Sequence, residues 1–385
     1  MNIKTVVSKI ISDVRQNGDA AVLKYTRAFD CPDLKNIAVS RQAIRRAYEQ
    51  ASPRLVSALK QASANITAVQ SAYLPKNTQV SPTPGISITR KFIPINTIGI
   101  YVPGGLAAYP SSVLMAAIPA RLAGVKNIIL CSPPSRSGRI SPAVLSACCL
   151  CTIKNVYAVG GAQAIAAMAY GTQTIPQVNK IVGPGSAVVT EAKRQVFGRV
   201  SIDSLAGPSE VVVLADATTN LDWAIADLLA DAEHGPDTLA VLVTTRRDLP
   251  PLPPKVKLVQ ANSLPGAIKY INNQGPEHVL VQTAFPYRVA RLITQAGTVY
   301  IGPYTSKGSG DYATGTNHIL PTGGRAKGFS GVSVDTFGRW VEYQTVTKDG
   351  LSSIRQTIEA LAETEGLPAH VTSTNIRFSK NYAKN

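Results

Sequence analysis

Short β-branched runs alternate with helical patterns through most of this 385-residue chain, and this alternation limits the possible folds most strongly. The predicted strands are Thr97–Val102, Asn127–Ser132, Asn155–Val159, Lys180–Val182, Val211–Ala215, Leu239–Thr244, His278–Val281 and Val299–Gly302. The predicted helices are Ser111–Ala123, Ser141–Cys151, Ala162–Tyr170, Ser186–Val196, Leu221–His234, Pro265–Asn273, Pro286–Ala296 and Leu351–Glu365. Helices between strands are typical of α/β units around a parallel sheet. The sequence therefore predicts an α/β protein.

Three glycine-rich turns each follow a predicted strand and precede a predicted helix. They are Pro103-Gly104-Gly105, Gly160-Gly161-Ala162-Gln163 and Gly183-Pro184-Gly185-Ser186. Free backbone N–H groups and the helix dipole favour phosphate at such places. None of the turns is a G-x-G-x-x-G motif, so a simple tight turn accounts for each one taken alone. Together they predict a ligand-binding edge at the carboxyl ends of the strands.

The composition excludes some classes of partner. The net charge is +16, with 39 basic and 23 acidic residues, but the basic residues are scattered without aromatic interleaving. This pattern argues against nucleic-acid binding, and a field that attracts an anionic cofactor or substrate explains the charge. No apolar run approaches the ~20 residues that span a bilayer, so we expect no membrane partner.

The cysteines do not form a recognisable metal or redox framework. Three of the five lie at Cys148, Cys149 and Cys151 in an apolar stretch, and no second pair stands at zinc-site spacing. We interpret them as small buried residues. A reduced, cytoplasmic location fits such cysteines best.

All four histidines lie in short polar clusters with carboxylates. They are His234, His278, His318 and His370. Histidine changes charge near neutral pH and is the commonest metal ligand. A satisfied surface histidine explains any single cluster, but four of four indicate that the residue is used for chemistry.

Asp231 and His234 lie three residues apart near the end of a predicted helix. This spacing puts two metal ligands on one helical face, although it equally suits a solvated face. Asp311 and His370 would complete a zinc shell of two histidines and two carboxylates. The sequence shows that these parts exist, not that they converge.

Glu277 and His278 open an apolar strand after Gly275-Pro276. A glutamate beside a histidine supplies two general bases of different strength. The alternative is a strand-start pair that bonds to neighbouring backbone.

The last predicted helix carries an apolar stripe of Ile354, Ile358 and Leu361, which Glu365 continues. A carboxylate on a buried face is costly unless it is paired. We therefore expect Glu365 and His370 to pair and to face protein rather than water.

Several stretches of the sequence match the pattern of a known enzyme family. The matching stretches are Tyr101-Val-Pro-Gly-Gly105, Gly160-Gly-Ala-Gln-Ala164, Ala206-Gly-Pro-Ser-Glu210, Ala232-Glu-His234, Gly275-Pro-Glu-His278, Gly310-Asp-Tyr-Ala313, Gly315-Thr-Asn-His-Ile-Leu-Pro-Thr322 and Glu365-Gly-Leu-Pro-Ala-His370. In order and spacing the chain resembles histidinol dehydrogenases from about Ser12 to His370.

The resemblance implies oxidation of L-histidinol to L-histidine, through a held L-histidinaldehyde, in two NAD-dependent hydride transfers. It implies one zinc ion per subunit that orients the substrate. The implied roles are metal binding for Asp231, His234, Asp311 and His370; catalysis for Glu277 and His278; substrate contact for these ligands, His278, Ser209, His318 and Glu365; and cofactor contact for Tyr101, Gln163 and Ser186.

The resemblance also implies two Rossmann-like domains and a homodimer with shared active sites. The expected parts are an N-terminal helical arm at 1–14, a first α/β domain at 15–100 and 211–332 with the metal and catalytic residues, an NAD-binding α/β domain at 101–210, and a helical segment at 333–385 that completes the partner's site.

Three positions depart from the family pattern. Asp231 replaces the usual glutamine, Ser186 replaces an asparagine, and the segment 245–260 is shortened around a proline-rich connector. A carboxylate ~4 Å from a cation attracts it by about 4 kcal/mol at an effective dielectric of ~20. We therefore expect the metal to bind at least as tightly here.

These departures leave alternatives open. A relative that oxidises another polar primary alcohol, such as a sulfonated diol, would use the same residues. A basic binding protein without catalysis would have no use for costly inward carboxylates. A hydrolase that uses zinc-bound water would leave the glycine-rich turns without a purpose.

Overall fold

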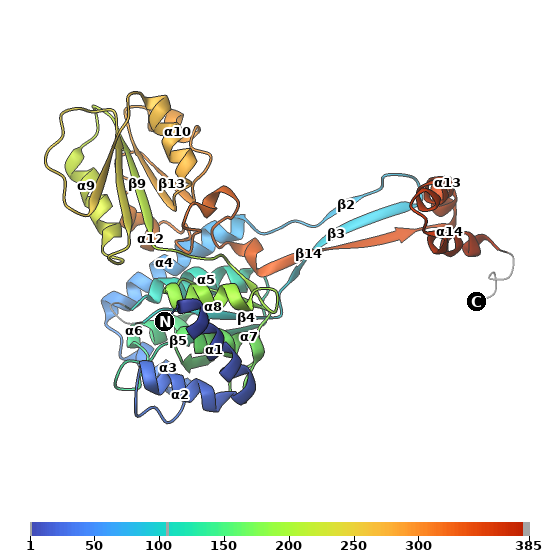
Figure 1. Ribbon diagram of the computed structural model, residues 1–385, viewed down its shortest axis with the longest axis horizontal. Helices are drawn as coiled ribbons and strands as arrows, with labels where there is room; N and C mark the ends of the chain where they lie inside the picture. Colours follow the sequence, from blue (N-terminus) through green and yellow to red (C-terminus); the bar gives the residue numbers. More distant parts are fainter. Residues whose placement is uncertain (1, 105–107, 380–385) are drawn as a thin grey trace. The chain divides into compact units, whose positions relative to one another are not determined.

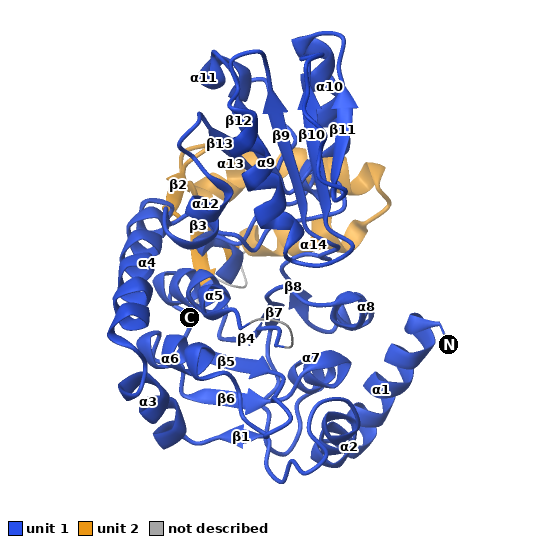
Figure 2. Cartoon of the chain, turned by 90° about the vertical axis from the view of Figure 1, so that its left-hand side faces the viewer, with its two compact units in different colours: residues 1–74, 94–337 blue, residues 75–93, 338–385 orange. Residues whose placement is uncertain are grey.

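The computed structural model describes residues 2–104 and 108–379, so Gly105 of the first glycine-rich turn lies outside the described residues. The chain forms two compact units. The first contains residues 1–74 and 94–337, and the second contains residues 75–93 and 338–385 (Figure 2). In the described part, no helix combines the length and the apolar character that crossing a membrane requires.

The first unit contains a six-stranded sheet in the order β1-β6-β5-β4-β7-β8. Its strands are β1 (Ala38–Val39), β4 (Thr97–Tyr101), β5 (Asn127–Ser132), β6 (Asn155–Ala158), β7 (Lys180–Val182) and β8 (Ser201–Ile202). β1 runs antiparallel to β6, and the other pairs are parallel. Its connecting helices are α5 (Pro110–Leu122), α6 (Pro142–Leu150), α7 (Gly161–Tyr170) and α8 (Ala187–Val196). α5, α6 and α7 are largely apolar and α8 is amphipathic, because these helices cover the faces of a parallel sheet.

A second sheet of the same unit has five parallel strands in the order β11-β10-β9-β12-β13. They are β9 (Glu210–Ala215), β10 (Leu239–Thr244), β11 (Val256–Gln260), β12 (His278–Gln282) and β13 (Thr298–Ile301). Its helices are α9 (Leu221–Ala232), α10 (Leu264–Gln274), α11 (Pro286–Ala290) and α12 (Lys307–Tyr312), followed by the 3₁₀ turns η1 (Arg325–Lys327) and η2 (Val334–Phe337). Two apolar clusters cover its faces, so every position of β12 is buried.

The α/β class and the parallel sheets are confirmed, and each predicted strand is present within one residue at either end. The short strand β11 was not expected, because the proline-rich connector before it conceals the strand. Helix α11 ends at Ala290, six residues before the predicted end.

The contacts divide the N-terminal region differently from the expected domains. Helices α1 (Ile3–Asn17), α2 (Asp19–Phe29), α3 (Arg41–Glu49) and α4 (Pro53–Ala72) precede both sheets. α1 packs on α7 and α8, α3 packs on α6, α4 packs on α5, and β1 pairs with β6 (Figure 1). Residues 15–72 therefore accompany the sheet expected to bind NAD rather than the sheet at 211–332. Apolar residues of α1 and α2 belong to the same core cluster as α7 and α8.

The second unit is a three-stranded sheet with a helical end. The strands are β2 (Thr78–Val80), β3 (Ile86–Pro94) and β14 (Gly338–Val346), in the order β14-β3-β2, and the helices are α13 (Lys348–Thr364), α14 (Pro368–Asn375) and the 3₁₀ turn η3 (Ile376–Phe378). Segment 333–385, expected to be helical, thus includes a nine-residue strand. The ring of Trp340 on β14 packs edge-on against that of Phe92 on β3, with 5.6 Å between centroids. Such cross-strand packing favours a strand at these positions.

Candidate active site

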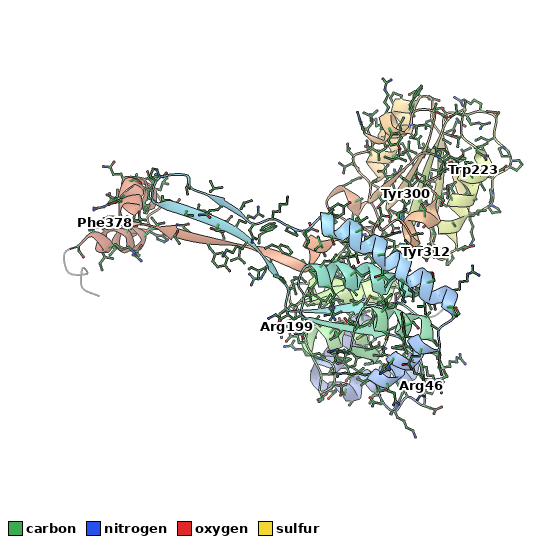
Figure 3. All side chains as sticks on the ribbon, turned by 180° about the vertical axis from the view of Figure 1, so that it is seen from behind. Arg46, Arg199, Trp223, Tyr300, Tyr312 and Phe378 are labelled. Carbon is green, nitrogen blue, oxygen red and sulfur yellow. The ribbon has the colours of Figure 1, made fainter. Side chains whose placement is uncertain are left out.

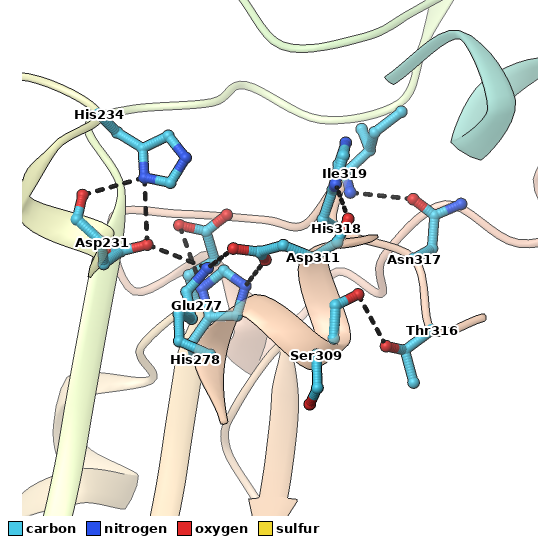
Figure 4. Close-up of polar contacts among 12 residues, drawn as sticks. Asp231, His234, Glu277, His278, Ser309, Asp311, Thr316, Asn317, His318 and Ile319 are labelled. Atoms are coloured by element: carbon cyan, nitrogen blue, oxygen red, sulfur yellow. Dashed lines mark hydrogen bonds and ion pairs between the residues drawn. The ribbon is translucent and has the colours of Figure 1, made fainter. Parts of the chain in front are cut away.

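Three short segments of the first unit bring a cluster of ionisable side chains together (Figure 4). The end of α9 supplies Asp231, and His234 follows two residues after that helix. The start of β12 supplies Glu277 and His278, and α12 supplies Asp311. His278 stands opposite Val211 of β9 and Thr298 of β13, so the cluster lies where the strands of the second sheet begin. A parallel register explains how residues distant in sequence meet at one edge.

His278 is the most deeply placed member of the cluster, with 1% of its surface exposed. Its Nδ1 lies 3.7 Å from Glu277 Oε2, and its Nε2 lies 3.8 Å from Asp311 Oδ1. The rings of His278 and Tyr300 have centroids 5.8 Å apart, and Tyr300 is labelled in Figure 3. Neither imidazole nitrogen has a hydrogen-bond partner among the described residues. Its ring therefore retains capacity to exchange a proton with a bound molecule.

Burial shifts the pKa values of the Glu277–His278 pair in opposite directions. Desolvation, followed by the charge of Lys307, lowers the pKa of His278 to about 3. Desolvation, followed by the charge of Asp231, raises the pKa of Glu277 well above its usual range. Both effects favour the neutral form. Glu277 Oε2 accepts a hydrogen bond from the backbone N–H of Glu210 at 3.1 Å, which fixes the carboxyl beside the ring.

Asp231 is fully buried, so the alternative of a solvated helical face is wrong at this position. The face of α9 that carries Asp227 and Asp231 points inward, while Leu229 on the same helix is 36% exposed. His234 Nδ1 lies 2.9 Å from the backbone oxygen of Asp231 and 3.4 Å from its Oδ1. The two residues therefore form a local contact at the helix end.

Lys307 is the member of the site that sequence reasoning missed. Its side chain is 2% exposed, and its Nζ lies 3.1 Å from Asp231 Oδ1 and 2.5 Å from Asp311 Oδ2. Although burial alone would lower it, the pKa of Lys307 is raised because Asp231 and Asp311 stabilise the ammonium. The i, i+4 spacing of Lys307 and Asp311 was the available signal.

The donor set does not fit the expected zinc ion. Two of the four implied ligands, Asp231 and Asp311, are already paired with one ammonium group. No group of three or more His, Cys, Asp or Glu side chains at metal-binding distance occurs within residues 2–104 and 108–379. We expected the extra negative charge of Asp231 to strengthen metal binding, but in the structure this carboxylate pairs with the ammonium of Lys307.

Two implied substrate residues border this cluster. His318 is half-buried, with Nδ1 2.8 Å from the backbone oxygen of Asp311 and Nε2 3.0 Å from Ser112 Oγ on α5. Ser209 immediately precedes β9, next to the Glu210 that bonds to Glu277. His318 thus contacts both the second-sheet cluster and a helix of the first sheet.

The implied cofactor residues follow strands of the first sheet. The backbone N–H of Gly161 donates to the Tyr101 hydroxyl at 3.2 Å. Gln163 is 1% exposed, and both polar atoms of its amide lack a partner within the described part of the chain. A buried amide without partners is costly, so it fits a position that a ligand completes. The donor set and the glycine-rich turns fit a dinucleotide.

The third glycine-rich turn leaves no room for side chains at its centre. Gly183 has φ +116°, and a Cβ there would lie 2.1 Å from the backbone oxygen of Tyr101. A Cβ on Gly185 would lie 2.3 Å from Val189 Cγ1. Ser186 is exposed at the N-cap of α8 and makes no side-chain capping bond. Its hydroxyl is therefore accessible.

Glu365 and His370 belong to the second unit and are exposed there. Glu365 is the C-cap of α13, and His370 lies in the first turn of α14. The expectation that the two residues pair against protein is wrong within the chain. No ion pair joins them among the described side chains. The apolar stripe of α13 does not bury Glu365 either, because Leu361 at the end of that stripe is itself 59% exposed.

Comparisons with known proteins give one consistent result. The sequence matches the family model described as histidinol dehydrogenase over residues 1–251 and 252–378. It is 41% identical to histidinol dehydrogenase of Methanosarcina barkeri, over 98% of this chain and 92% of that protein. It is also 41% identical to the Aliivibrio fischeri enzyme, over 98% and 91%. The crystal structure of histidinol dehydrogenase from Elizabethkingia anophelis superposes with a TM-score of 0.92 at 38% identity, over 98% of this chain and 92% of that one.

Proposed function

The chain belongs to the histidinol dehydrogenase family, and we propose that it oxidises L-histidinol to L-histidine through a held L-histidinaldehyde, as the last steps of histidine biosynthesis. The first step transfers a hydride from the alcohol carbon to NAD⁺ and releases the hydroxyl proton. The second adds water to the aldehyde and transfers another hydride to a second NAD⁺, giving the carboxylate. The chain is thus an oxidoreductase that removes four electrons.

The single observation that best supports this activity is the geometry of His278. A buried neutral imidazole whose two nitrogens have no partner among the described residues, flanked by two carboxyl groups, can accept the hydroxyl proton as the hydride leaves. Glu277, held beside it, would assist the addition of water to the aldehyde. The proton of the first step would pass from the substrate oxygen to an imidazole nitrogen.

The first sheet would hold NAD. Gln163 would direct its unpartnered amide at the cofactor, Tyr101 would border the Gly160–Gly161 turn, and Ser186 would offer its hydroxyl. NAD supplies the hydride acceptor when bound. Glycines at the close approaches let the backbone N–H groups reach a pyrophosphate.

Zinc takes no part in the proposed steps, because Lys307 engages two of its four implied ligands. In place of a metal, substrate orientation would rest on Ser209 and His318 in the first unit. Histidinol carries an ammonium and an imidazole, and the surrounding carboxylates suit such a substrate.

The proposal predicts the stoichiometry of the reaction. Purified protein mixed with NAD⁺ and L-histidinol is expected to form about two NADH per histidine, because both oxidations occur before release. NADH absorbance and chromatographic product counting measure the ratio. One NADH per substrate with free aldehyde, or no reaction, would contradict the proposal.

A homodimer would explain the exposed end of the second unit. Glu365, His370 and Leu361 are exposed in the chain. We propose that this segment of one subunit completes the site of its partner. The cytoplasmic location remains a prediction.

The runner-up is a relative that oxidises another polar primary alcohol, such as a sulfonated diol. The observation that favours it is Lys307, an unexpected cation in the site. The same NADH assay with both alcohols separates the two proposals.

The histidines are expected to titrate differently. The pKa of His278, lowered to about 3 by burial and Lys307, keeps its ring neutral between pH 5 and 8. The pKa of His234 is raised, chiefly by its bond to Asp231, so its ring should titrate above the usual value of about 6.5. Ring-proton NMR, assigned with His278→Asn and His234→Asn, measures both.

The lowered pKa of His278 also makes the stability of the fold depend on pH. The unfolded state binds the His278 proton below about pH 6.5, whereas the folded state does so only near pH 3. This residue therefore destabilises the fold as pH falls through that window. A His278 resonance that titrates near pH 6.5 would refute the assignment.

A further inference from the structure

Lys307 occupies a built position between two carboxylates. Its backbone N–H donates to Asp227 Oδ1 at 2.9 Å, and Gln282 Nε2 donates to the other oxygen of Asp227 at 2.8 Å. These buried bonds fix the start of α12. The side chain then reaches Asp311 one turn later and Asp231 on α9. Lys307 is therefore part of the packed site and not a surface lysine that folded inward.

The charges near Lys307 explain why the ammonium stays. Asp231 and Asp311 are both buried, with exposures of 0% and 7%. A buried carboxylate without a cation is strongly unfavourable. A compact ammonium offers three donors and can serve two carboxylates at once.

A divalent ion could not share this position with the ammonium. Zinc binds carboxylate oxygens at about 2.0–2.2 Å, so it would have to occupy the space between the same Asp231 and Asp311 oxygens. Two adjacent cations also repel each other by several kcal/mol at an effective dielectric of ~20. Zinc binding would thus require Lys307 to leave a buried site in which it pairs with both carboxylates.

We propose that the ammonium of Lys307 takes the place of a divalent metal ion at this site, so that Asp231 and Asp311 have a buried cationic partner without bound zinc. The inference rests on the proposed function only for the identity of the substrate. It makes Lys307 a positioning residue: the ammonium holds Asp311 beside His278 and Asp231 beside His234. The chain would carry out its dehydrogenase chemistry without a retained metal.

The test measures zinc on the full-length protein. Protein incubated with Zn²⁺ alone and passed through gel filtration is analysed for metal, and the affinity is measured by calorimetry. The wild-type chain is expected to retain far less than one zinc per chain. Lys307→Met and Lys307→Gln are expected to bind zinc at least about 100-fold more tightly, because a cation within about 4 Å is removed.

A matched control removes a lysine elsewhere in the first unit. Lys180 on β7 donates to the Thr336 backbone oxygen at 2.7 Å and forms no ion pair among the described residues. Lys180→Met should leave zinc uptake unchanged. Thermal melting confirms that each variant is folded, and the wild-type metal count decides the question even if the Lys307 variants fail to fold.

Zinc retained at one per chain by the wild type, with an affinity that Lys307→Met does not change, would overturn the proposal. Histidinol turnover is measured separately after EDTA treatment and is expected to persist. Failure to oxidise histidinol would count against the proposed function, while the zinc measurement would still decide the role of Lys307.

Discussion

Replacing His278 with asparagine is expected to lower kcat for histidinol oxidation by about 10²–10⁴-fold, the range for loss of a general base. Asparagine preserves a polar side chain of similar reach but cannot accept the hydroxyl proton. Burial, which leaves 1% of His278 exposed, prevents bulk water from substituting freely for the ring. Initial NADH formation at saturating NAD⁺ and histidinol measures the loss.

Cofactor binding provides the control for this variant. Gln163 and the glycine-rich turns lie on the first sheet, whereas His278 begins a strand of the second. NAD binding and the melting temperature should therefore change little in His278→Asn. An unchanged kcat would remove His278 from the reaction, and a parallel loss of NAD binding would indicate a misfolded site.

The sequence predicted the sheets well because their strands are continuous apolar runs. β5, β7 and β10 match the predicted ranges residue for residue, since buried strands leave a strong local signal. β3 and β14 were missed because their residues are mostly exposed or half-buried and alternate weakly. The placement of α1–α3 on the first sheet depends on packing between distant segments, which periodicity does not encode.

The candidate site was likewise predicted only in part from the sequence. Short motifs identified Asp231, His234 and Asp311, and the structure brings these three residues to one edge of the second sheet. Motifs could not reveal that Lys307 lies between two of them, because a lysine four residues before an aspartate usually forms an exposed helical pair. Because Lys307 is buried, it acts instead as the counter-ion of Asp231 and Asp311.

Replacing Lys193 with methionine is expected to lower the free energy of unfolding by about 3–5 kcal/mol, the usual cost of breaking one partner of a buried pair. Lys193 on α8 is 2% exposed and forms an ion pair with Asp203. Its Nζ also donates to the backbone oxygen of Gly183 at 3.0 Å, while Asp203 Oδ2 accepts from the Gly183 N–H at 2.7 Å. The pair therefore binds both the backbone carbonyl and the backbone N–H of Gly183 in the third glycine-rich turn. Urea unfolding measures the loss.

The double variant Lys193→Met/Asp203→Asn distinguishes charge from packing. Asparagine can still accept the Gly183 N–H but leaves no buried charge, so part of the lost stability should return relative to Lys193→Met. We also expect Lys193→Met to weaken NAD binding, and this affinity should not return in the double variant, because the Gly183 carbonyl still lacks its lysine donor. A double variant as unstable as the single one, with normal NAD affinity, would mean that the ion pair supports only the packing of α8. Recovery of stability without recovery of affinity would tie the Lys193–Asp203 pair to the shape of the cofactor turn.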